Sequence, residues 1–225
     1  MPSSNSSQNR QFRVLKKQAN CDDLFFYQKG DALYQLTYKF CQRFLPKYGD
    51  RTVDQMVQAA RSGKQNIAEG LADGVTSTEM QIKLLNVGRS SFLELCKDFL
   101  DYLGTRDLSA WDTANPRFNK MLKFCREHNK AEEYKPFFEI WTDEEMANVA
   151  ITLCHIIDKL MTNYISAIEE EFVTQGGIKE RMYAARTGYR KTETEELANL
   201  RAENNLLKQR IAVLEQQLAQ STLKK

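Results

Sequence analysis

The sequence predicts an all-α protein: an antiparallel four-helix bundle followed by a C-terminal parallel coiled coil. Apolar residues recur at steps of three or four through four long stretches between residues 23 and 175, which is the period of a helix with one buried face. After residue 192 a heptad pattern replaces this spacing. Only 4 Pro and 10 Gly occur in 225 residues, which argues against an all-β sandwich and its frequent turns.

The first 22 residues are expected to form a disordered polar tail. Ser, Asn and Gln dominate them, together with Arg10, Arg13, Lys16 and Lys17. Such a composition cannot bury enough apolar surface to offset the entropy of ordering the chain. The alternative is a weak phosphate-contacting arm. The stretch after Met1 lacks the apolar segment of a signal peptide.

The bundle is expected over residues 23–175, and its first two helices have recognisable ends. The first helix starts at Asp23 and ends before Pro46, because proline disfavours a helical conformation in the residue before it. The second helix starts near Asp50, which is a plausible N-cap. It ends at a turn bracketed by Gly70 and Gly74.

The third and fourth helices flank an irregular insert over residues 105–142. The third is expected to open at residues 76–77, where Thr76 and Glu79 have the spacing of a capping box, and to stop near Gly104. Within the insert one short helix is predicted around residues 117–128. The fourth helix is long, and its apolar spacing continues from residue 143 to residue 172. Four long helices of this kind are typical of an antiparallel bundle.

A leucine-zipper pattern predicts the coiled coil over residues 192–222. Alternating steps of three and four define its a and d positions, with Leu197 at a: Leu197, Leu200, Asn204, Leu207, Ile211, Leu214 and Leu218. In a parallel dimer three pairs of flanking g and e residues would have opposite charges: Glu196 with Arg201, Glu203 with Lys208, and Arg210 with Glu215. An Asn at one a position favours two strands in register. We therefore expect a parallel homodimer.

No catalytic constellation is recognisable, so the chain is predicted not to be an enzyme and to need no cofactor. His155 adjoins an apolar stripe and is interpreted as a structural residue, while Cys41, Cys96 and Cys154 are interpreted as small apolar fillers. The sequence contains neither metal-ligand spacing nor a glycine-rich phosphate loop. The five Cys lack C-x-x-C spacing, which fits a reducing cytoplasm. No apolar run is long enough to span a membrane.

A basic connecting segment is predicted over residues 176–191. Five basic residues and one acidic residue, Glu180, lie between residues 178 and 191: Lys179, Arg181, Arg186, Arg190 and Lys191. A basic segment directly before a zipper is also the order of basic-zipper DNA-binding proteins, but Gly188 would weaken a continuous helix. We therefore favour a general phosphate-contacting patch over sequence-specific DNA reading. The alternative is a solvated hinge. The net charge of +2 excludes attraction of nucleic acid by the whole surface.

Three stretches carry a family resemblance: residues 58–62 (Gln-Ala-Ala-Arg-Ser), 66–70 (Asn-Ile-Ala-Glu-Gly) and 88–95 (Gly-Arg-Ser-Ser-Phe-Leu-Glu-Leu). They resemble the bacterial four-helix-bundle family of ribosomal-RNA intervening-sequence proteins, which includes the accessory variability proteins of diversity-generating retroelements. Residues 27–54 with 176–190 look like its "four helix bundle suffix" subgroup. The resemblance implies a bundle without known catalysis, ring-like pentamers, and basic outer surfaces that bind RNA and a reverse transcriptase.

The motif residues themselves are interpreted as structural. Small side chains on the second and third helices, among them Gly63 and Gly88, would let the two backbones approach closely. We also expect Glu69 and Glu94 to pair with Arg61 or Arg89 near that crossing, since buried charges persist only when partnered.

Together these features predict a cytoplasmic, non-enzymatic, homo-oligomeric adaptor that binds RNA or a reverse-transcriptase-like nucleoprotein. The candidate contacts are Arg61, Lys64, Arg89, Lys179, Arg181, Arg186, Arg190 and Lys191. A dimer is favoured over the pentamer that the family resemblance implies, because the heptad pattern is observed directly in this sequence. The alternative function is a protein–protein scaffold with no nucleic-acid role. A third hypothesis, an enzyme, would need a cleft holding several titratable groups of displaced pKa.

Overall fold

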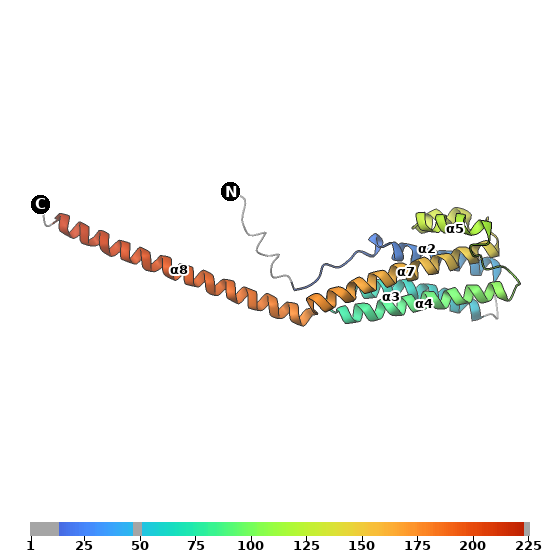
Figure 1. Cartoon of the computed structure of the whole chain (residues 1–225), viewed down its shortest axis with the longest axis horizontal. Coiled ribbons are helices and arrows are strands. Elements are labelled where there is room, and N and C mark those ends of the chain that lie inside the picture. Colours follow the sequence, from blue (N-terminus) through green and yellow to red (C-terminus); the bar gives the residue numbers. More distant parts are fainter. Residues whose placement is uncertain (1–13, 47–50, 223–225) are drawn as a thin grey trace. The chain divides into compact units, whose positions relative to one another are not determined.

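Helices are the only regular elements in residues 14–46 and 51–222, the parts of the chain that the computed structural model describes (Figure 1). The predicted all-α class is therefore confirmed. In chain order the elements are η1 (Cys21–Asp23), α2 (Phe25–Phe44), α3 (Arg51–Asp73), α4 (Thr78–Gly104), α5 (Pro116–Glu127), α6 (Ala131–Tyr134), η2 (Lys135–Phe137), α7 (Asp143–Gln175) and α8 (Ile178–Thr222). They divide into two compact units: a core unit of residues 15–177, and the unit that contains α8.

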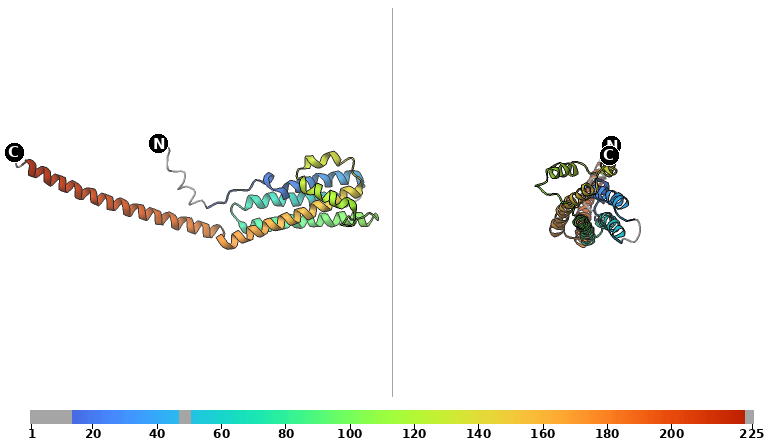
Figure 2. Two further views of the ribbon diagram at one scale, coloured as in Figure 1. Left: turned by 45° about the horizontal axis from the view of Figure 1, so that its top comes forward. Right: turned by 90° about the vertical axis from the view of Figure 1, so that its right-hand side faces the viewer.

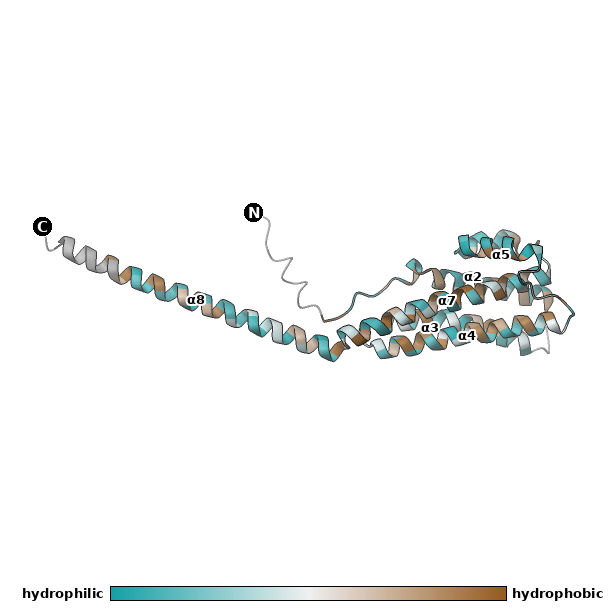
Figure 3. Ribbon diagram, viewed as in Figure 1, coloured by the Kyte–Doolittle hydropathy of each residue, from teal (hydrophilic) through white to brown (hydrophobic). Residues whose placement is uncertain are grey.

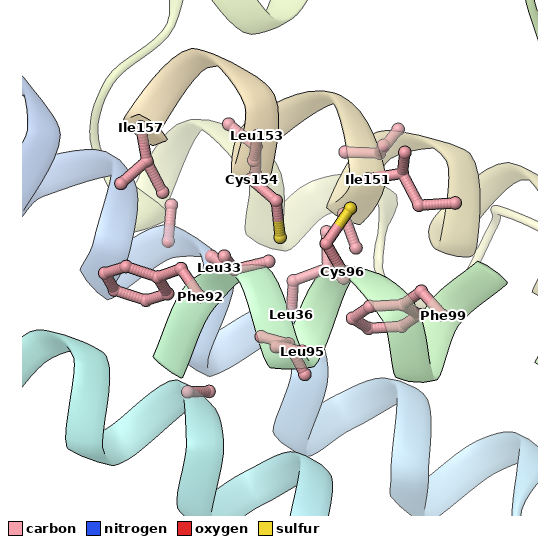
Figure 4. Packing of buried hydrophobic residues seen from close by; sticks show 14 of the residues in the cluster. Leu33, Leu36, Phe92, Leu95, Cys96, Phe99, Ile151, Leu153, Cys154 and Ile157 are labelled. Atoms are coloured by element: carbon pink, nitrogen blue, oxygen red, sulfur yellow. The ribbon is translucent and has the colours of Figure 1, made fainter. Parts of the chain in front are cut away.

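Four long helices of the core unit, α2, α3, α4 and α7, surround one apolar core (Figure 2). Helix α3 packs against α2 and α4, and α7 also packs against α2 and α4, while α5 lies on α7 and α6 lies on α2. Figure 4 shows the centre of this core, where Phe92 of α4 lies near Leu33 of α2 and Cys96 of α4 lies near Cys154 of α7. All four side chains are almost completely buried.

The helix ends are set by local hydrogen bonds. Helix α4 is capped by Ser77, whose hydroxyl accepts a hydrogen bond from the Met80 backbone N–H at 3.1 Å, so the predicted capping role of Thr76 is wrong. The Thr76 hydroxyl instead donates to the Asp73 carbonyl oxygen. Helix α7 opens with a capping box between Thr142 and Glu145. It therefore starts at the predicted residue, and it continues to Gln175, three residues beyond the predicted end.

The N-terminal segment differs from its prediction. The predicted disordered tail of residues 1–22 falls partly outside the described residues, but residues 15–22 belong to the core unit. Ala19 and Cys21 pack against the core, and Lys16 forms an ion pair with Glu171 at 3.0 Å. These contacts supply the burial that the local composition lacks. A 3₁₀ turn at Cys21–Asp23 displaces the start of the first long helix to Phe25. The predicted N-cap at Asp50 lies outside the described residues.

The insert between α4 and α7 is more structured than predicted. Its expected short helix is present as α5, and α6 and η2 follow it. Lys29, on α2, holds the C-terminal end of α5, because its ammonium donates hydrogen bonds to the carbonyl oxygens of Cys125 and His128. Phe124 stacks on His128 with ring centroids 4.2 Å apart. The insert thus becomes part of the packed core unit rather than an irregular loop.

Helices α3 and α4 approach closely at two glycines, as predicted from the small residues of the family-like motifs. A Cβ atom added at Gly88 would lie 2.9 Å from the backbone carbonyl oxygen of Gly63, and one added at Gly63 would lie 2.7 Å from ring atoms of Phe92. The hydroxyls of Ser62 and Ser91 are 3.2 Å apart at the same crossing. These contacts leave no room for a larger side chain.

Helix α8 is a single helix of 45 residues. Residues 178–191 of the predicted basic connecting segment and the predicted coil over residues 192–222, assigned to separate segments from the sequence, are both part of it. Gly188 does not interrupt it, since one glycine costs a helix only about 1 kcal/mol relative to alanine. Figure 3 shows apolar and polar residues alternating along α8. In the part of the chain that the structure describes, no helix has the length and apolar character needed to cross a membrane.

Candidate functional site

Two of the candidate nucleic-acid contacts on the core unit already have acidic partners. The Lys64 ammonium lies 2.7 Å from a carboxylate oxygen of Asp31, and the Arg89 guanidinium lies 2.6 Å from Asp158. All four side chains are only partly exposed, between 26% and 34%. The charges of these two cations are compensated within the core unit, which leaves them little attraction for phosphate. Arg61, the third candidate on the core unit, is exposed on α3.

The acidic partners differ from those predicted. Arg89 pairs with Asp158 on α7, whereas Glu69 accepts a hydrogen bond from Gln65 one turn earlier on its own helix. Glu94 is exposed on α4. The expected pairing of Glu69 or Glu94 with Arg61 or Arg89 is therefore wrong. Because α7 packs against α4, its carboxylate comes within reach of Arg89, and no local sequence spacing could have revealed this neighbour.

The remaining candidate cations lie together on the first turns of α8. Lys179, Arg186, Arg190 and Lys191 are exposed, and Arg181 is half-buried. Lys179, Arg186 and Arg190 follow one another at steps of seven and four, so they lie on one face of the helix. Tyr183 is also exposed, at 68%, and occupies the same face.

That face continues into the predicted zipper. Residue 190 precedes Leu197 by one heptad, so the cations occupy the same a and d positions as the later leucines. Five apolar seam residues are 45% to 60% exposed: Leu197, Leu200, Leu207, Ile211 and Leu214. Asn204 is exposed among them, and the side chain of Leu218 lies outside the described residues. This face is therefore basic at Lys179, Arg186 and Arg190, carries Glu193 at the next d position, and is apolar except for Asn204 from Leu197 to Leu214.

The cysteines and histidines occupy different environments. Cys41, Cys96, Cys125 and Cys154 are buried and Cys21 is half-exposed, so the predicted filler role of three of them fits their positions. Burial raises the pKa of the Cys154 thiol well above its ordinary value, and Figure 4 shows its sulfur near that of Cys96. His155, predicted to be structural, is instead exposed on α7. No group of three potential metal ligands occurs among the described residues.

A recess that was not predicted from the sequence lies where α2, α5 and α7 meet. Its volume is about 660 Å³. Four basic side chains from three helices line it: Lys29, Arg126, His155 and Lys159. Only the spacing of His155 and Lys159, four residues apart on one helix, was visible in the sequence. Their alignment with Arg126 depends on how α5 lies against α7, which the sequence does not reveal.

Comparison of the chain with protein-family models, with curated proteins and with solved structures gave no match. The family resemblance drawn from the motifs therefore stays a prediction.

Proposed function

We propose that this chain is a non-enzymatic homo-oligomeric adaptor that binds RNA or an RNA-containing nucleoprotein. In this proposal the core unit is an antiparallel four-helix bundle, α8 pairs in parallel with α8 of a second copy, and the basic turns of α8 contact phosphate. One observation carries it: a single face of α8 is basic over its first turns and mainly apolar from Leu197 to Leu214. The cytoplasm is the proposed location, because four of the five free thiols are buried and the other is half-exposed, as suits a reducing compartment.

Self-association follows from the exposed seam. A solitary helix gains most of its stability from packing an apolar face, but the seam leucines and Ile211 of α8 are about half exposed. A second copy of α8 would bury them together in heptad register. Asn204 could then hydrogen-bond with its counterpart across the axis, which favours two strands. The pentamer implied by the resembling family is the alternative assembly.

Contact with phosphate follows from the basic part of the same face. In a parallel dimer, Arg186 and Arg190 of one copy would meet their counterparts at the seam, and like charges in that position repel. The two helices would then separate over these turns and present both sets of cations to a polyanion. Exposed Tyr183 offers a ring on which an unpaired base could stack. RNA loops and single strands provide both phosphates and unstacked bases.

The test combines mass and RNA binding on the full chain. Sedimentation is expected to give twice the chain mass, and filter binding of an RNA hairpin with single-stranded flanks is expected to weaken steeply as salt rises. The double variant Arg186→Gln with Arg190→Gln should lower the slope of log affinity against log salt by about 0.7 for each single-strand phosphate that it no longer neutralises.

The matched control carries the same charge change on the core unit. Lys83 and Lys97 are exposed on α4, so Lys83→Gln with Lys97→Gln should leave both affinity and slope nearly unchanged. Equal losses of affinity in the two double variants would show that only net charge matters. A monomeric full chain would contradict the proposed self-association. RNA binding that does not respond to salt would contradict the proposed phosphate contact.

A protein–protein scaffold without a nucleic-acid role is the second candidate. The compensated charges of Lys64 and Arg89 favour it, because they reduce the basic surface of the core unit. In this case partners recovered with the tagged full chain should remain bound after nuclease treatment. Their loss on nuclease treatment would instead favour the RNA proposal.

A further inference from the structure

The recess between α2, α5 and α7 is lined by basic side chains and by no acidic ones. Its lining includes Lys29, Arg126, His155 and Lys159 and no Asp or Glu. Within residues 14–46 and 51–222, no ion pair engages Lys29, Arg126, His155 or Lys159. This distinguishes the recess from the α3 and α4 surfaces, where Lys64 and Arg89 are paired with acids. The recess is therefore lined by cationic side chains that form no ion pair within the described residues.

Lys29 adds a buried charge to this lining. Its side chain is nearly inaccessible, with a residue exposure of 2%, and its ammonium donates to two backbone carbonyl oxygens at the end of α5. An ammonium has three donors, and carbonyl dipoles do not supply a full counter-charge. Burial accordingly lowers the pKa of Lys29. Glu133, which does not line the recess, offsets only part of the effect of burial on Lys29. Because a buried charge is stabilised by an opposite charge nearby, an anion entering the recess would be stabilised there.

The rest of the lining is largely apolar. Phe118 and Leu122 come from one face of α5, Ile156 and Leu160 from one face of α7, and Phe25 from the first turn of α2. On α5 and on α7 the two apolar residues are four positions apart, so they are neighbours on one face of the helix and form an apolar wall of the recess. The volume of about 660 Å³ falls within the range of pockets that hold small organic ligands.

We propose that this recess binds a small amphipathic organic anion, with its acidic headgroup at Arg126 and Lys159 and its apolar tail or ring against the walls formed by α5 and α7. The recess is bounded by three helices, which suits a monomeric ligand better than the flat surface of a membrane. The proposal does not depend on RNA binding, because α8 contributes no residue to the recess.

Calorimetric titration of the full chain with decanoate, below the concentration at which it forms micelles, tests the proposal. We expect saturable binding at one site per chain. Hexanoate should bind more weakly, by about fourfold for each methylene group that the recess no longer buries. Decyltrimethylammonium, which has the same tail and the opposite charge, should not bind measurably.

Variants locate the site. Arg126→Gln and Lys159→Gln should each weaken decanoate binding by about fivefold, the effect of losing one partly exposed ion pair. Lys123→Gln is the matched control, because Lys123 is exposed on the same helix as Arg126 and pairs with Glu127 outside the recess. It should leave the affinity unchanged.

Any of the following results would overturn the proposal: no saturable heat with decanoate, equal binding of decyltrimethylammonium, or equal losses of affinity in Lys123→Gln and the two recess variants. Binding of the chain to phosphatidylglycerol vesicles without binding to free decanoate would also overturn it, because the ligand source would then be a membrane surface.

Discussion

Replacing Gly88 by alanine tests the closest contact between two helices of the core unit. A Cβ atom at this position would lie 2.9 Å from the backbone carbonyl oxygen of Gly63 and 3.3 Å from the Cβ of Asn66. The obstructing atom belongs to the backbone of α3, so it cannot rotate away as the end of a flexible side chain could. Helices α3 and α4 would have to move apart locally to admit the methyl group.

The expected loss of stability is the difference between two effects. Forcing a methyl group into a packed site costs about 1–3 kcal/mol, whereas replacing glycine by alanine inside a helix gains about 1 kcal/mol. Because the obstacle is backbone, we expect the steric cost to lie in the upper part of its range. The variant Gly88→Ala should therefore be less stable by about 1–2 kcal/mol.

Gly104→Ala is the matched control on the same helix. A Cβ atom there would meet no atom within 4 Å, so this variant should be as stable as the native chain or up to about 1 kcal/mol more stable. Urea unfolding followed by tryptophan fluorescence measures both variants. Trp111 and Trp141, the two tryptophans of the chain, lie in the core unit, so the signal is independent of α8. Equal midpoints for the two variants would refute the close approach of α3 and α4.

Three further predictions concern other parts of the chain. Asn204→Ile should raise the melting temperature and weaken the preference for two strands, since it replaces the polar a residue of the proposed seam; unchanged mass and melting would contradict the register. Ellman's reagent should titrate one thiol rapidly in the folded chain, that of half-exposed Cys21, and the four buried thiols only after unfolding; a second fast thiol would contradict this burial. Two effects raise the pKa of Tyr102 to about 12: burial, which is the larger, and the hydrogen bond that its hydroxyl donates to Asp143. The folded state therefore favours the protonated phenol, and this contribution to stability, complete below the ordinary pKa of 10.0, should be lost as pH rises toward about 12. Tyr102→Phe should make that alkaline loss smaller, and an identical loss in both proteins would contradict it.

The helices were predictable from the sequence because their signals are local. The spacing of apolar residues depends only on the helix period, and it identified four long helices, the short helix of the insert and the heptad face of α8. The glycines at positions 63 and 88 likewise predicted a close approach of two helices, because two backbones can come this near only where no side chain lies between them. The heptad positions along α8 can be assigned without knowing which helix, if any, packs against it.

Pairing between helices could not be predicted in the same way. Arg89 reaches Asp158, 69 residues later, and Lys64 reaches Asp31, 33 residues earlier; neither partner can be chosen until the neighbouring helices are known. The same holds for residues 15–22, which their composition suggested to be disordered and which belong to the core unit, with Ala19 and Cys21 against the core.

The sequence by itself thus determined the all-α class, the approximate helix boundaries and the face of α8 that carries first cations and then leucines, because each depends on residues within a few turns of one another. The tertiary structure alone decided which cations are compensated and which are not. Arg126 and Lys159 belong to different helices, and they line the same recess only because α5 packs against α7. Charge compensation depends on distance in space, and the distance along the chain does not specify it.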